Sequence, residues 1–384
     1  MNSRERCLAA LNHQEGDRIP FDVGGTVNTT IHVMAYAALR DYLGLPKREI
    51  QTLHQAAQVA RLHEDFLEKL KVDTRFVDRD MPITRGSAQL LDEGDYVAFY
   101  DSWGVGWHMP KQGGFYYDMY FHPLNVDDIW ERLKTYRWPE ADNPALFQGM
   151  RERALEAQRK EKLVLLGGFS AGLVEKHAWL RGFERAYLDY ASEPQLLEKI
   201  MDKLTELKIT YWQHVLPLVG DLVDVAVEGD DFAGQERLLF SPKTFRQVVK
   251  PRHAAVFAAI KKAAPHIKIH FHSCGAIRSV LPDLIEIGVD AINPVQINAS
   301  GMDPYGLKKD FGRDIVFWGG GVDTQKVFSS GTAQEVRADV RRNIDALAPG
   351  GGFIFTPVHN TQANVPPENF MSMWETLQEF GVYS

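Results

Sequence analysis

Short apolar runs alternate with longer amphipathic stretches along most of this chain, and this alternation limits its possible folds more than any other feature. The apolar runs have the length of buried strands and lie at residues 19–23, 72–77, 163–168, 222–227, 267–272, 289–293, 315–318 and 353–356. Between most of them apolar residues recur with a helical period, as in 195–215, 242–262 and 333–348. Eight such strands with intervening helices predict an α/β fold, a (β/α)8 TIM barrel, with an open doubly wound sheet as the alternative.

The remaining organisation predicts one soluble unit. No Pro/Ser-rich or low-complexity linker divides the 384 residues, so a single barrel domain over 1–384 is expected. The net charge of −8 argues against a nucleic-acid partner, and no apolar run is long enough to cross a membrane. With two cysteines and no signal-peptide pattern at the start, we expect a reducing, cytoplasmic location.

One segment does not follow the strand–helix rhythm. Residues 96–122, YVAFYDSWGVGWHMPKQGGFYYDMYFH, are dense in aromatic side chains and glycine. We predict an antiparallel insertion after the second strand, near the barrel mouth. It would serve either as a stabilising flap or as a substrate lid, because loops at barrel mouths often carry such roles.

A His-x-Cys pair at the end of a strand is the sharpest chemical motif. In IKIHFHSCG, residues 267–275, the alternation places His272 and Cys274 on the same side, at the strand's carboxyl end. Barrel active sites lie at that end, and imidazole with thiolate suits zinc. A catalytic zinc usually takes three protein ligands, and His359, just past the last predicted strand, is the expected third. Taken singly, a cysteine or histidine is more often an ordinary core residue.

A second polar group follows the fourth predicted strand, in VAVEGDDFAGQ, residues 225–235. Clustered carboxylates favour a cation, a bound substrate or a raised pKa, although a solvated loop with a helix-capping aspartate is the simpler alternative. Glu228 is a candidate catalytic residue, either as a metal ligand or as the partner that orients a ligating histidine. Asp231 is a second catalytic or substrate-binding candidate. Substrate-binding candidates are Gln235 here and Asn293 and Gln296 at the end of the sixth strand.

The runs GDDFAGQ, HSCG, DLIEIGVDAINPVQ, WGGGVDTQ and GGGFIFTPVHNTQANVPPEN, in this order, resemble the uroporphyrinogen decarboxylase superfamily from about residue 163 onward. The resemblance implies a barrel enzyme of one of two branches. Decarboxylases in this family carry an arginine-rich stretch after the first strand, where this chain has FDVGGTVNT. Asp78, in FVD, does match their pocket aspartate, so it is a further substrate-binding candidate.

The other branch resembles this chain through its His-x-Cys pair. Its members are zinc-dependent methyltransferases that work with a corrinoid protein, which implies Zn²⁺ at His272 and Cys274 and a corrinoid carried by a partner. His359 departs from the pattern, because related enzymes commonly place a cysteine there. The resemblance implies methyl transfer between the corrinoid and a thiol, tetrahydrofolate or methyl ether. Cofactor-free decarboxylation of uroporphyrinogen or a related carboxylate is the alternative, and a ligand-binding barrel without catalysis is a third hypothesis.

Overall fold

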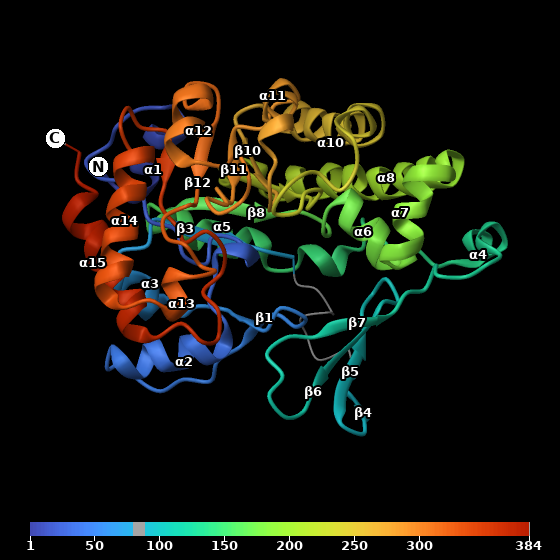
Figure 1. The fold of residues 1–384 in the computed structure, drawn as a ribbon, viewed down its shortest axis with the longest axis horizontal. Helices are drawn as coiled ribbons and strands as arrows, with labels where there is room; N and C mark the ends of the chain where they lie inside the picture. Colours follow the sequence, from blue (N-terminus) through green and yellow to red (C-terminus); the bar gives the residue numbers. More distant parts are fainter. Residues whose placement is uncertain (80–88, 384) are drawn as a thin grey trace.

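A curled parallel sheet of seven strands forms the centre of the computed structural model, which describes residues 1–79 and 89–383 (Figure 1). The strands follow one another around the sheet in chain order, and each pair of neighbours is parallel. They are β3 (Thr74–Val77), β8 (Leu163–Gly167), β9 (Val225–Gly229), β10 (Lys268–His272), β11 (Ala291–Asn293), β12 (Val316–Trp318) and β13 (Phe353–Ile354). Seven of the eight predicted strands are therefore present, and the α/β TIM-barrel-like class is confirmed.

The prediction of a first strand at residues 19–23 is wrong, because the structure has no regular strand there. The segment lies where a barrel needs it, because Phe21 forms a parallel bridge with Phe355 and its carbonyl accepts the N–H of Asp73 at 2.9 Å. It forms no regular ladder, however. Pro20 has no N–H to donate, and the Asp22 carboxylate turns inward to accept from Thr74 and Trp318. The sheet therefore closes between its end strands, β13 and β3, only through the contacts of Phe21 with Phe355 and Asp73.

Helices follow the strands as the sequence predicted (Figure 1). Residues 195–215 lie in α8 and residues 333–348 match α14, whereas 242–262 is divided into α9, a π-helical turn at Phe245–Val249, and α10. The helices are α1 (Ser3–Leu11), α2 (Val33–Tyr42), α3 (Glu64–Lys69), α4 (Ile129–Thr135), α5 (Met150–Arg159), α6 (Leu173–Arg181), α7 (Phe183–Ser192), α8 (Pro194–Val219), α9 (Pro242–Thr244), α10 (Lys250–Ala263), α11 (Leu281–Glu286), α12 (Pro304–Phe311), α13 (Val327–Ser330), α14 (Ala333–Leu347) and α15 (Pro367–Phe380).

The barrel interior is a packed layer closed at one end by α1. Side chains that start the strands, such as Leu163 and Val225, pack with Cys7 and Leu11 of α1 in one buried cluster. Because these are the amino-terminal residues of their strands, α1 forms the floor of the barrel. The opposite, carboxyl ends of the strands remain for the functional site.

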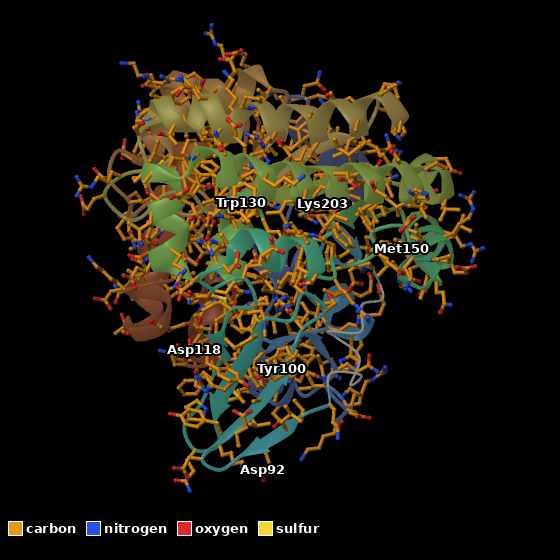
Figure 2. All side chains as sticks on the ribbon, turned by 90° about the vertical axis from the view of Figure 1, so that its right-hand side faces the viewer. Asp92, Tyr100, Asp118, Trp130, Met150 and Lys203 are labelled. Carbon is orange, nitrogen blue, oxygen red and sulfur yellow. The ribbon has the colours of Figure 1, made fainter. Side chains whose placement is uncertain are left out.

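The predicted insertion is an antiparallel sheet of four strands between β3 and β8. These are β4 (Leu91–Glu93), β5 (Tyr96–Tyr100), β6 (Gly106–Pro110) and β7 (Asp118–Phe121), and a short hairpin, β1 (Thr52–His54) and β2 (Val59–Ala60), precedes β3. The sheet projects away from the barrel helices in Figure 1. Asp92, Tyr100 and Asp118 mark it in Figure 2.

Within the described part of the chain, no helix combines the length and the apolar character that a membrane crossing requires.

Candidate metal centre

The structure brings together the three predicted metal ligands. His272 is the last residue of β10, Cys274 follows two residues later, and His359 lies in the loop after β13. One potential ligand atom from each lies within 4.8 Å of the others, and the Cys274 Sγ is 3.5 Å from the His272 Nε2. Two imidazoles and one thiol form a donor set that suits a catalytic zinc, which keeps a further position open.

Hydrogen bonds hold the His272 ring in the tautomer that a metal needs. Its Nδ1 lies 2.6 Å from the Oδ1 of Asn293, and the Asn293 Nδ2 donates to the carbonyl of Trp318 at 2.7 Å. Because the amide nitrogen is engaged by that carbonyl, the amide oxygen faces the imidazole and accepts a proton from Nδ1. The Nε2 lone pair is then free for a metal on the side of Cys274.

Burial adjusts the protonation of the other two ligands. Burial and the nearby carboxyl groups of Asp231 and Glu175 raise the pKa of the Cys274 thiol well above its usual range. Burial, together with His272, lowers the pKa of His359 to about 4, so this imidazole is neutral at physiological pH. A neutral imidazole is ready to ligate, whereas a bound cation would have to displace the thiol proton.

Asp231 supports the Cys274 loop. Its Oδ1 accepts the N–H of Cys274 at 2.7 Å and lies 3.8 Å from the His272 Nε2. The neighbouring Asp230 has a different task, because its carboxylate accepts the N–H groups of Val174 and Glu175 in the first turn of α6, and His253 Nε2 lies 2.9 Å from its Oδ2. Asp230 is thus a buried cap of the earlier helix α6 and not part of a solvated loop, while Asp231 lies beside the candidate ligands.

The carboxylate of Glu228 is engaged on both oxygens. Lys208 donates to Oε2 and the Trp212 indole to Oε1, each at 2.7 Å, and both partners come from the preceding helix α8. The orienting bond to His272 comes from Asn293 instead. A role for Glu228 at the metal stays a prediction, supported by no contact in the described structure.

A cavity of about 360 Å³ opens onto His272 and His359. The insertion sheet and its loops supply part of its wall through Phe99, Trp103 and Trp107, which favours a role in substrate binding over a purely stabilising flap. The other walls come mostly from the ends of β3, β8 and β9, the hairpin β1–β2 and the start of α6.

The four substrate-binding candidates are not all in this cavity. Asp78 lines it and bonds to Arg61 at 3.2 Å. Asn293 and Gln296 are absent from the lining: the first orients His272, and the Oε1 of the second accepts the N–H of Gly275 at 2.6 Å. Gln235 is exposed and also lies outside the cavity. Asn293 and Gln296 therefore support His272 and the Cys274 loop, and their roles in substrate binding stay predictions.

Sequence reasoning missed a group of cavity residues on α6. Glu175, Lys176 and Trp179 all line the cavity, but they belong to an ordinary helical pattern without a motif. Burial and the neighbouring Asp231 raise the pKa of Glu175 to about 8, so its carboxyl group is protonated at neutral pH. The only available signal was their position just after a predicted strand end.

Asn293→Leu is expected to weaken zinc binding about 10- to 100-fold, because His272 loses the acceptor that fixes its tautomer and orientation. Competition with a chromophoric chelator measures the affinity. Gln235→Leu is the matched control, since this amide is exposed and makes no contact with the ligands. Equal zinc affinity in Asn293→Leu and wild type would rule out the orienting role.

A family model described as uroporphyrinogen decarboxylase (URO-D) matches residues 119–380. A solved methyltransferase from Methanosarcina mazei is 16% identical, with a TM-score of 0.63 over 99% of both chains, which supports the fold. A xylanase from Thermotoga maritima has a TM-score of 0.40 at 11% identity over 66% of this chain and 91% of its own. No curated protein matches the sequence.

Proposed function

This chain belongs to the uroporphyrinogen decarboxylase family, and we propose that it is a zinc-dependent methyltransferase within it. The methyl group would move between a corrinoid carried by a partner protein and a small-molecule donor or acceptor. The observation that carries this proposal is the group of His272, Cys274 and His359 at the strand ends, of which both histidines line a cavity. A cofactor-free decarboxylase has no use for such a donor set.

The three ligand residues would hold the zinc. When bound there, zinc supplies a Lewis acid that lowers the pKa of a thiol or polarises the oxygen of a methyl donor. Asn293 keeps the Nε2 of His272 available, and Asp231 holds the backbone of Cys274 in place. Glu175, which is protonated at neutral pH, can supply a proton at its carboxyl oxygen to a leaving group in the cavity.

The size of the cavity indicates which of the two reaction partners can be enclosed in it. About 360 Å³ suits a small molecule such as a thiol or a methyl ether, and one end of tetrahydrofolate could enter it. A corrinoid is far too large to be enclosed there. It would approach the mouth from outside on its own carrier protein, while Trp103 and Trp107 supply apolar wall to the cavity.

Asp78 favours the alternative, a decarboxylase of uroporphyrinogen or a related carboxylate. It lines the cavity with Arg79 beside it and Arg61 bonded to it, and cations of this kind pair with substrate carboxylates. This alternative requires activity without any metal, which separates it from the methyltransferase proposal.

The test uses free cobalamin as the probe. Reduced cobalamin is mixed with the purified protein and a panel of methyl donors, and methylcobalamin with a panel of thiols, while the cobalamin absorption spectrum is followed. We expect a protein-dependent spectral change that disappears after chelator treatment and returns with zinc. Equal rates before and after metal removal would contradict the proposal, and uroporphyrinogen decarboxylation by the metal-free protein would establish the alternative.

A further inference from the structure

A buried lysine faces the cavity from α6. Lys176 is only 3% exposed and lines the cavity. Its Nζ lies 4.8 Å from the ring centroid of Trp103 and 4.2 Å from that of Trp179. The ammonium group therefore sits between two indoles, one from the insertion and one from its own helix.

No acceptor satisfies this ammonium among the described residues. Lys176 Nζ has neither a hydrogen bond nor a carboxylate within ion-pair distance, whereas the equally buried Lys208 has both. The carboxylate of Asp101 is already used by the N–H groups of Trp103 and Val105 and by the Trp107 indole. Burial lowers the pKa of Lys176 to about 8, although the charge of Asp101 partly opposes this shift.

An ammonium group buried without a hydrogen-bond acceptor costs folding free energy unless a ligand supplies the acceptor. Indole faces attract a cation, but they accept none of its three N–H donors. Buried charges in proteins are normally paired, so the unfilled donors of Lys176 favour an anionic ligand in the neighbouring cavity. The surrounding wall of Trp103, Trp107 and Trp179 offers flat apolar surfaces to the body of that ligand.

We propose that Lys176 anchors an anion subsite that binds the carboxylate of a small planar substrate, whose ring lies against the three tryptophans. The identity of this ligand as the methyl-transfer substrate rests on the proposed function. The subsite adjoins the candidate metal centre: Glu175, the preceding residue, lines the cavity together with Asp231, and Asp231 accepts the backbone N–H of Cys274. A ligand held at Lys176 thus shares one cavity with His272 and His359.

A carboxylate fits this subsite better than a more highly charged group. One ammonium neutralises one charge, and the adjacent wall is apolar. Arg79 also lines the cavity and adds positive potential. The predicted ligand class is therefore an aromatic monocarboxylate.

The test compares benzoate with benzamide, its neutral isostere, by quenching of tryptophan fluorescence. The titrations use the zinc-loaded protein and a zinc-free Cys274→Ser variant, because a carboxylate could also bind the metal. We expect benzoate to bind at least tenfold more tightly than benzamide in both proteins. Lys176→Met should remove this difference and leave benzamide binding intact, whereas Lys111→Met, an exposed lysine on the insertion, should change neither.

Three outcomes would overturn the inference. Equal binding of benzoate and benzamide to wild type would do so without any variant. A preference for benzoate that survives in Lys176→Met, or in Lys176→Gln if the methionine variant does not fold, would also exclude the lysine. Benzoate binding only in the zinc-loaded protein would assign the anion to the metal. Because the decisive arm is zinc-free, its result is independent of whether methyl transfer is found.

Discussion

Cys274→Ser is expected to reduce the zinc content of the purified protein from about one per chain to near zero. Methyl transfer should fall by more than about 100-fold, because losing a direct ligand should cost more than the 10- to 100-fold typical of an outer-shell contact. A serine hydroxyl is not a zinc donor at neutral pH, and His272 and His359 alone do not make a catalytic zinc site. Metal analysis by mass spectrometry and the cobalamin assay measure the two effects.

The fold should survive this change. The supporting bond to Asp231 comes from the backbone N–H of residue 274, which serine keeps. Cys7→Ser is the matched control: it makes the same substitution in a fully buried core position on α1, away from the cavity. That variant should lose stability and keep its zinc. Full zinc content in Cys274→Ser would contradict the assignment of the metal centre.

Lys208→Met is expected to lower the free energy of unfolding by about 3–5 kcal/mol, because it leaves the buried carboxylate of Glu228 without its cation. The side chains of both partners are almost completely buried, at 1% and 0% exposure, so water cannot replace the lost partner. Urea denaturation followed by circular dichroism measures the change.

The double variant Lys208→Met with Glu228→Gln should recover much of this loss, because no unpaired charge remains. It also separates two roles of Glu228. Normal zinc content and activity in the double variant would show that Glu228 has a structural role. Loss of zinc from a folded double variant would show that Glu228 is needed for zinc binding. Unchanged stability in Lys208→Met alone would show that the pair contributes nothing to folding.

Strand periodicity correctly predicted which side chains of β10 lie on the same side. In residues 267–275 the alternation puts Ile269 and Phe271 on one side of the strand. It placed His270 and His272 on the other side. Phe271 does pack against Phe257 of α10, and His270 lies inside the barrel at 5.0 Å from the Trp318 ring. The pairing of β10 with its neighbours then fixes which strand ends meet, so His272 and Cys274 could be identified from local pattern alone.

Strand periodicity could not predict which side chains from distant helices contact the strand ends. Glu228 looked like one of three mutually repelling carboxylates, but Lys208 and Trp212 engage it from α8 and His253 lies beside its neighbour Asp230 from α10. Helix faces carry no sign of which strand end they will contact. The same limit hid the cavity, whose wall combines the insertion with α6.

Contacts of α1 bring the N-terminal and C-terminal parts of the chain together when the protein folds. This helix packs on β13 as well as β8, and nearby the N–H of Ile19 donates to the carbonyl of Gly381, so residues far apart in sequence meet at one edge of the barrel. Both termini accordingly lie on the same side in Figure 1. Contacts of such long sequence separation form late and slowly, because a long loop must close first. The barrel interior therefore remains open to solvent until β13 and the segment around Gly381 have been synthesised, and this interval is when the protein is most exposed to aggregation.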